Sequence, residues 1–123
     1  LLYRVADHCR RQEILPLTSG DQVKDWSYVV DLSEWILDLA ALAGAIPHKV
    51  MNISSGLRMS VRDLAFAAAQ KLQGEHLLQF GAVPIPAGEV QTGPADLTRF
   101  NSILGDRYTT PLDIALAHTL GAS

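Results

Sequence analysis

Histidine, cysteine and serine side chains are the candidates for chemistry in this 123-residue chain, and their spacing argues against catalysis. Asp7, His8 and Cys9 are consecutive, and adjacent helical residues point about 100° apart, so the three side chains cannot converge on one metal ion. No pairing of a serine or cysteine with a histidine is supported by the sequence. The sequence therefore predicts no catalytic residue and no metal site. The four histidines, which lack metal-ligand spacing, are His8, His48, His76 and His118.

The stretch that begins at Gly20 organises the elements around it. Gly20 and Asp21 are typical of a turn, because glycine reaches positive φ freely and aspartate can bond its own backbone. Residues 25–30 alternate between two sets of side chains, which predicts a strand with one buried face. Asp31 then predicts a helix N-cap, and Glu34 at the third helical position would complete a capping box.

The rest of the chain alternates between amphipathic helices and short strands, without a repeat, a low-complexity tract or a linker. This order predicts a small mixed α/β domain of four or five helices, and a single domain that comprises residues 1–123. Helix starts are indicated by the capping residues Ser60, Asp96 and Thr110. We expect helices at residues 1–12, 32–43, 61–72, 97–104 and 112–120, and further strands at 14–17, 49–54, 77–82 and 89–92.

Composition excludes several classes of protein. Hydrophobic residues make up 48% of the chain and charged residues 19%, which argues against disorder. A net charge of -3 offers no basic field for nucleic acid, and no apolar run approaches the roughly 20 residues that span a bilayer. The single cysteine excludes an internal disulfide and favours a cytoplasmic location. The chain starts without methionine, apparently within a helix, so we expect it to be the tail of a longer protein.

Five segments carry a resemblance to a known family. The stretch from Gly20 to Asp31 resembles Gly-Asp-Gly-x-Gln-x-Arg-Asp-Phe/Trp-x-Tyr-Val-x-Asp of the extended short-chain dehydrogenases/reductases, the NAD-dependent epimerases and dehydratases that modify nucleotide sugars. In that family the segment opens the C-terminal substrate-binding lobe, so the resemblance implies this lobe without its Rossmann domain. The other matching segments, in the family's order, are residues 50–56, 60–64, 86–89 and 95–99, with a looser match at 104–112.

The resemblance implies a binding site for a nucleoside-diphosphate sugar. An arginine of the family that reaches the diphosphate falls at Lys24, and a second falls at Pro86. Lys24 keeps a cation but loses the planar fork of arginine, and Pro86 supplies no charge. The expected substrate-binding residues are Gln22, Lys24, Trp26 and Arg58. A core position for Trp26 and surface positions for Lys24 and Arg58 are the alternatives.

The catalytic half of the family's motifs is missing from this chain. No Gly-x-x-Gly-x-x-Gly turn follows a strand, and no lysine lies four residues after Tyr3, Tyr28 or Tyr108. We therefore expect no cofactor bound by this chain, although NAD or NADP is implied for a full-length family member. A second hypothesis is a stand-alone, non-catalytic module that forms homo-oligomers through the face left by the missing domain. A third is a small α/β domain whose resemblance is accidental.

Overall fold

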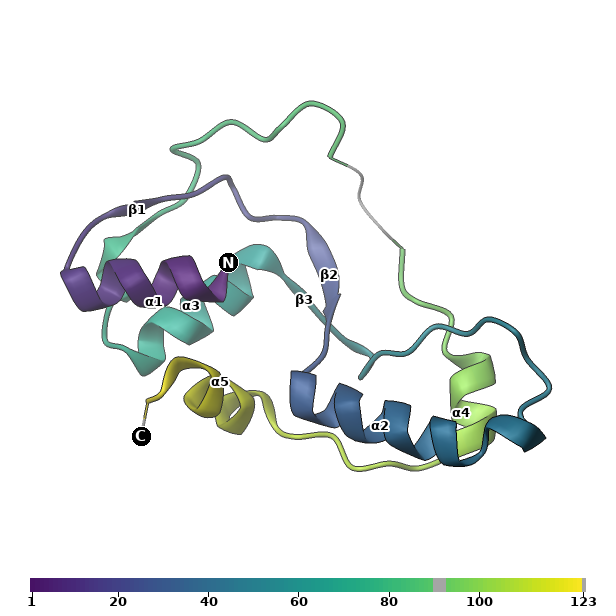
Figure 1. Ribbon diagram of the computed structural model, residues 1–123. Coiled ribbons are helices and arrows are strands. Elements are labelled where there is room, and N and C mark those ends of the chain that lie inside the picture. Colours follow the sequence, from purple (N-terminus) through teal and green to yellow (C-terminus); the bar gives the residue numbers. More distant parts are fainter. Residues whose placement is uncertain (90–92, 123) are drawn as a thin grey trace. The chain divides into compact units, whose positions relative to one another are not determined.

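The computed structural model describes residues 1–89 and 93–122 (Figure 1). Its described part contains five helices and four short strands, which confirms the expected α/β class. None of these helices is long and apolar enough to cross a membrane. The elements are α1 (Leu2–Arg11), β1 (Leu15–Pro16), β2 (Val23–Trp26), α2 (Val29–Ala41), β3 (Leu57–Ser60), α3 (Val61–Lys71), β4 (Leu78–Gln79), α4 (Thr98–Leu104) and α5 (Leu112–Leu120), with 3₁₀ turns at Ala43–Ala45 and Glu75–Leu77.

The chain divides into two compact units. The first comprises the described residues of 1–24, 59–92 and 111–123, and the second comprises 25–58 and 93–110. Strands β2 and β3 pair with each other, and the chain passes from one unit to the other within each of them. The strand expected at 89–92 lies almost entirely outside the described residues.

The first unit is a helical layer in which α1 and α5 both pack on α3 (Figure 1). Strand β1 runs parallel to β4, with Leu15 opposite Leu78 and Pro16 opposite Gln79. Pro16 is tolerated because each strand of a two-stranded sheet is an edge. The buried hydrophobic side chains of this unit are small or aliphatic: Val5, Ala6, Cys9, Leu15, Leu17, Leu64, Ala65, Ala68, Ala69, Leu77, Ala115, Leu116 and Leu120.

Two local features of this unit follow from single residues. Ser60 caps α3 as predicted: its Oγ accepts a hydrogen bond from the Asp63 amide at 2.9 Å and donates one to Asp63 Oδ2 at 2.7 Å. Gly74 lies against Cys9, and a Cβ at position 74 would lie 2.4 Å from Cys9 Sγ. Glycine is therefore required there by the closeness of α1 rather than by its backbone angles.

The second unit is built on aromatic side chains between α2 and α4. Trp35 and Phe100 meet edge to face, with ring centroids 5.7 Å apart and planes at 60°. Leu39 completes the buried cluster. The half-buried residues around it are Leu32, Ile46, Met51, Ile53, Leu97, Ile103 and Leu104.

One sequence-based prediction for the second unit is wrong. The strand predicted at 49–54 is irregular backbone, and the next strand, β3, begins only at Leu57. Met51 and Ile53 pack on the aromatic cluster, so the apolar run reflects burial of alternate side chains without a ladder partner. Val50, which directly precedes Met51, does not belong to the cluster and is 73% exposed.

The start of α2 is also misplaced by the sequence patterns. β2 ends at Trp26, and α2 begins at Val29, two residues before the predicted N-cap Asp31. The Asp31 carboxylate is buried in the first turn of α2 and accepts hydrogen bonds from the Thr110 amide at 2.8 Å and the Thr110 hydroxyl at 2.6 Å. A carboxylate in the first turn still favours the helix through its dipole. Thr110 donates its hydrogen bonds to Asp31 and is not the N-cap of α5 that the sequence predicted. Pro111 holds the N-cap position instead.

Candidate functional site

Gln22 is held firmly in the first unit by hydrogen bonds. Its side chain is buried, and its Nε2 donates to Glu89 Oε2 at 2.8 Å. The Gln22 carbonyl accepts from the Val61 amide at 2.9 Å, which ties the segment before β2 to the start of α3. The side-chain Oε1 is buried and has no hydrogen-bond partner in the described part of the chain. A buried amide oxygen without a donor is costly, and a ligand that brings a donor would satisfy it.

The cation Arg62 of the first unit lies beside the same segment, at Gly20 and Asp21. The Arg62 amide donates to the Gly20 carbonyl at 2.9 Å, and a Cβ on Gly20 would lie 3.0 Å from the Arg62 backbone nitrogen. Its guanidinium lies 4.4 Å from the centroid of the Phe80 ring and its Nε 3.9 Å from Asp21 Oδ1. Sequence reasoning missed Arg62 as a candidate, because its only sequence signal is its place just after the cap of α3.

Lys24 and Pro86 are the positions at which the family resemblance places phosphate-binding arginines. Both belong to the first unit. Lys24 is a half-buried residue of β2, and Pro86 is exposed in the segment after β4. The first unit therefore contains both positions of the expected phosphate clamp, and only one of the two, Lys24, is a cation.

Trp26 and Arg58 belong to the second unit. Trp26 is half-buried at the end of β2, and the buried tryptophan at the centre of the aromatic cluster is Trp35 instead. Arg58 is exposed on β3, with its Nε 3.5 Å from Asp25 Oδ1. Asp25 Oδ2 also accepts a hydrogen bond from the Ala95 amide at 2.9 Å. The charge of Arg58 is thus partly compensated, and its contact with a substrate stays a prediction, as it does for Gln22, Lys24 and Trp26.

Within the described residues, a strand leads directly into a helix at two places, and neither junction contains glycine. β3 continues into α3 without an intervening residue, and β2 is joined to α2 by Ser27 and Tyr28. A dinucleotide site needs glycine at such a junction, so that the backbone can approach the pyrophosphate. Neither junction therefore offers the glycine that this kind of dinucleotide site needs.

Comparisons with solved structures show that the fold of this chain occurs as part of several larger enzymes. No protein-family model and no curated protein matches the sequence. Among solved structures, the chain is similar to TunA, an NAD-dependent NDP-hexosamine 5,6-dehydratase of tunicamycin biosynthesis, with a TM-score of 0.78 and 23% identity over 98% of this chain and 39% of that one. It is also similar to the UDP-N-acetylglucosamine 4-epimerase of Methanobrevibacter ruminantium, solved with UDP-N-acetylmuramic acid, with a TM-score of 0.78 and 15% identity over 98% of this chain and 38% of that one.

A third similar structure is RMD from Pseudomonas aeruginosa, solved with NADPH. Its TM-score is 0.72 and its identity 22%, over 98% of this chain and 39% of that one. These matches confirm the expected fold, a small α/β domain like the C-terminal lobe of epimerase/dehydratase structures. They confirm the resemblance to the extended short-chain dehydrogenases at the level of the fold. The chain spans about two-fifths of the length of the structures it matches.

Proposed function

We propose that this chain is the substrate-binding lobe of an NAD(P)-dependent epimerase/dehydratase-like protein, and that it holds a nucleoside-diphosphate sugar without catalysing a reaction on its own. The observation that carries the proposal is the match of nearly the whole chain to about two-fifths of such enzymes. Under this proposal, residues outside the chain bind the cofactor and supply the catalytic side chains. This agrees with the two strand-to-helix junctions, which lack glycine.

The proposed phosphate contact lies in the first unit. Lys24 would attract the diphosphate as a point charge, since an ammonium group cannot grip two oxygens through a planar fork. Gln22, two residues before Lys24 in the sequence, is held in place by its hydrogen bond to Glu89. The Oε1 of Gln22 has no partner among the described residues and would accept a hydrogen bond from a ligand hydroxyl or amide. With Pro86 in place of a second arginine, we expect a weak site for a diphosphate.

A titration with UDP-, GDP- and dTDP-linked hexoses, followed by NMR of the ¹⁵N-labelled chain, tests this proposal. We expect saturable shifts of amide signals in β2 with one of the three, and a loss of saturation in Lys24→Ala. Lys24→Arg is expected to tighten binding several-fold, because arginine restores the bidentate contact. Lys71→Ala, which removes one exposed lysine of the same unit, is the matched control and should bind like the wild type. Absence of saturation with every nucleotide sugar would overturn the binding role.

A second candidate function is a non-catalytic module that associates with a second copy of itself. The observation that favours it is an apolar face of α2: Val29 is 65% exposed, Ile36 48% and Leu37 69%. Val29 and Ile36 are seven residues apart and share one side of the helix. Exposed apolar clusters of this kind mark association surfaces.

Sedimentation velocity over a concentration series separates the two functions. Self-association that Ile36→Glu abolishes supports the module. Val50→Glu adds the same charge at an exposed valine of the same unit that is not part of α2, and should leave association unchanged. A chain that stays monomeric at high concentration rules out the module.

A further inference from the structure

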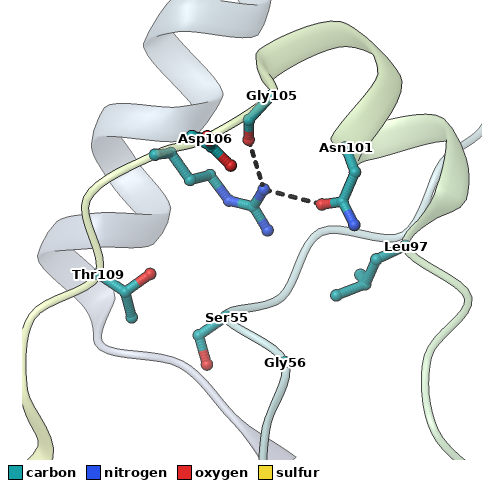
Figure 2. Close-up of a pocket in the computed structure, with 8 residues that line it drawn as sticks. Ser55, Gly56, Leu97, Asn101, Gly105, Asp106 and Thr109 are labelled. Atoms are coloured by element: carbon teal, nitrogen blue, oxygen red, sulfur yellow. Dashed lines mark hydrogen bonds between the residues drawn. The ribbon is translucent and has the colours of Figure 1, made fainter.

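The second unit contains a polar pocket of about 500 Å³ that none of the sequence motifs anticipated (Figure 2). One side is formed by Ser55 and Gly56 of the loop before β3, and another by Leu97 and Asn101 at α4. The segment after α4 closes it with Gly105, Asp106, Arg107 and Thr109. A pocket of this volume accommodates a small ligand.

The guanidinium of Arg107 is fixed in this pocket by three hydrogen bonds. Nη1 donates to Asn101 Oδ1 at 2.8 Å and to the Gly105 carbonyl at 3.4 Å, as the dashed lines in Figure 2 show. Nη2 donates to the Ser54 carbonyl at 3.1 Å. The group also stacks on the aromatic cluster, 3.9 Å from the centroid of Phe100 and 5.0 Å from that of Trp35. Its position is therefore set before any ligand arrives.

The charge of Arg107 is not matched by an anion. All three of its acceptors are neutral oxygens, and it takes part in no ion pair in the described part of the chain. Its Nε is buried without a hydrogen-bond partner among those residues. Partial burial lowers the pKa of the guanidinium, although arginine stays ionised at neutral pH. A partly buried cation of this kind is normally paired with a negative group.

Asn101 adds a second donor to the pocket. Arginine can only donate hydrogen bonds, so the oxygen of the Asn101 amide must face Arg107. The Asn101 nitrogen then points away from Arg107, toward the side of the pocket where Leu97 lies, as Figure 2 shows. The amide N–H₂ of Asn101 and the guanidinium thus present donors to the same space. Asp106 also lines the pocket, but it is exposed and forms no ion pair with Arg107.

We propose that this pocket binds a small oxyanion, the phosphate or carboxylate group of a ligand, through Arg107 and Asn101. Charge-assisted hydrogen bonds from a fixed guanidinium are the strongest contacts that such an anion can make with a protein. The residues that line the pocket do not include Gln22, Lys24, Trp26 or Arg58, so this proposal rests on other side chains than the proposed diphosphate contact. The two proposals can therefore be tested with different variants.

Titration of the ¹⁵N-labelled chain with sodium phosphate and, separately, with sodium acetate tests the site, with sodium chloride holding the ionic strength constant. We expect saturable shifts of the Asn101 side-chain amide and of the Gly56 and Gly105 backbone amides, with a midpoint in the millimolar range. Saturation by phosphate alone identifies a phosphate-bearing ligand, and saturation by acetate alone a carboxylate. The proposal is overturned if neither anion saturates.

Asn101→Asp is the decisive variant. An aspartate keeps the acceptor oxygen for Arg107, so the fold is maintained, and its carboxylate neutralises the guanidinium. We expect anion affinity to fall at least about tenfold, because both the charge and the amide donor are lost. Arg107→Met should abolish binding, and Arg99→Met is its control, since it removes an exposed arginine of the same unit that bonds the Val50 carbonyl. Unchanged affinity in Asn101→Asp would overturn the proposal even if Arg107→Met does not fold.

Discussion

Each of the two units of this chain is stabilised internally by a different kind of contact. In the first, helices α1, α3 and α5 bury alanine and small aliphatic side chains, and glycine at position 74 allows the closest contact. In the second, polar side chains bond backbone groups far along the chain and so fix segments without regular structure. These bonds join Asp25 to Ala95, Asp31 to Thr110, Asn52 to Asp96, Arg99 to Val50 and Arg107 to Ser54.

This difference explains what irregular backbone needs in order to be stable. Residues 46–56 have no helix or strand to satisfy their peptide groups, so side chains from other segments supply the donors. Each such bond contributes about 1 kcal/mol net, and leaving a buried partner unsatisfied costs more. The second unit should therefore respond strongly to the loss of polar side chains as well as to truncation of its aromatic cluster, and the first mainly to changes in side-chain volume.

Truncation of the aromatic cluster is expected to have the largest effect. Phe100 is fully buried and lies under both Trp35 and Arg107. Phe100→Ala should lower the free energy of unfolding by about 3–5 kcal/mol, from lost transfer energy and the cavity left behind. Chemical denaturation measures the change. Phe100→Leu is the control and should cost much less, and equal losses in both variants would show that the cluster is loosely packed.

Removal of the Asp31 carboxylate tests the polar side of the comparison. Asp31→Ala leaves the Thr110 amide and hydroxyl without their acceptor, and we expect a loss of about 2–3 kcal/mol. Asp31→Asn keeps one acceptor oxygen and should lose less. Hydrogen exchange at the Thr110 amide, compared between the two variants, identifies the bond responsible. Equal protection of that amide in the wild type and Asp31→Ala would contradict the assignment.

Overpacking between Gly74 and Cys9 tests the first unit. Gly74→Ala places a methyl group against Cys9 Sγ and should cost about 1–2 kcal/mol. Cys9→Ala removes the sulfur, so the double variant should lose less than the sum of the two single variants. A double-mutant cycle from thermal unfolding measures this coupling. Additive losses would mean that α1 shifts away rather than meeting the new methyl group.

The smallest effect is expected from acid at the start of α4. Hydrogen bonds from the Thr98 side chain and amide, assisted by the charge of Arg99, hold the pKa of Asp96 below its ordinary value. A depressed carboxyl pKa stabilises the fold above the ordinary aspartate pKa, and this contribution is lost as the pH falls through the folded-state value. Between about pH 6 and about pH 3, wild type should therefore lose slightly more stability than Asp96→Asn. Parallel pH profiles would contradict this.

Local signals in the sequence predicted the first unit well. The helix at Ser60 follows from a cap and its partner three residues on, and α1 and α5 follow from apolar residues at helical spacing. In the second unit the same rules placed a strand at 49–54 and a cap at Asp31, because they cannot register bonds to Asp96 or Thr110, far away in sequence. Hydrogen bonds between residues far apart in the chain produce no periodic pattern in the sequence, so sequence patterns cannot predict them.

The candidate site shows the same division. A linear motif led to Gln22, Lys24 and Trp26 as candidates, and Arg58 was chosen for its place after a predicted strand. Neither signal could predict that Gln22 pairs with Glu89 or Arg58 with Asp25. Arg107 escaped notice entirely. Its lack of an ion pair among the described residues is a property of three-dimensional packing, and the sequence Gly-Asp-Arg around it suggests an ordinary surface turn.

The contact between Gly74 and Cys9 also gives the first unit a built-in reporter of its own motion. Cys9 is the single cysteine of the chain and is 3% exposed, and burial, with a smaller contribution from Glu75, raises the pKa of its thiol. An alkylating reagent needs an accessible thiolate, so it can react only when α1 separates from the segment around Gly74. The labelling rate of the native chain therefore reads out the free energy of that local opening, with no probe introduced.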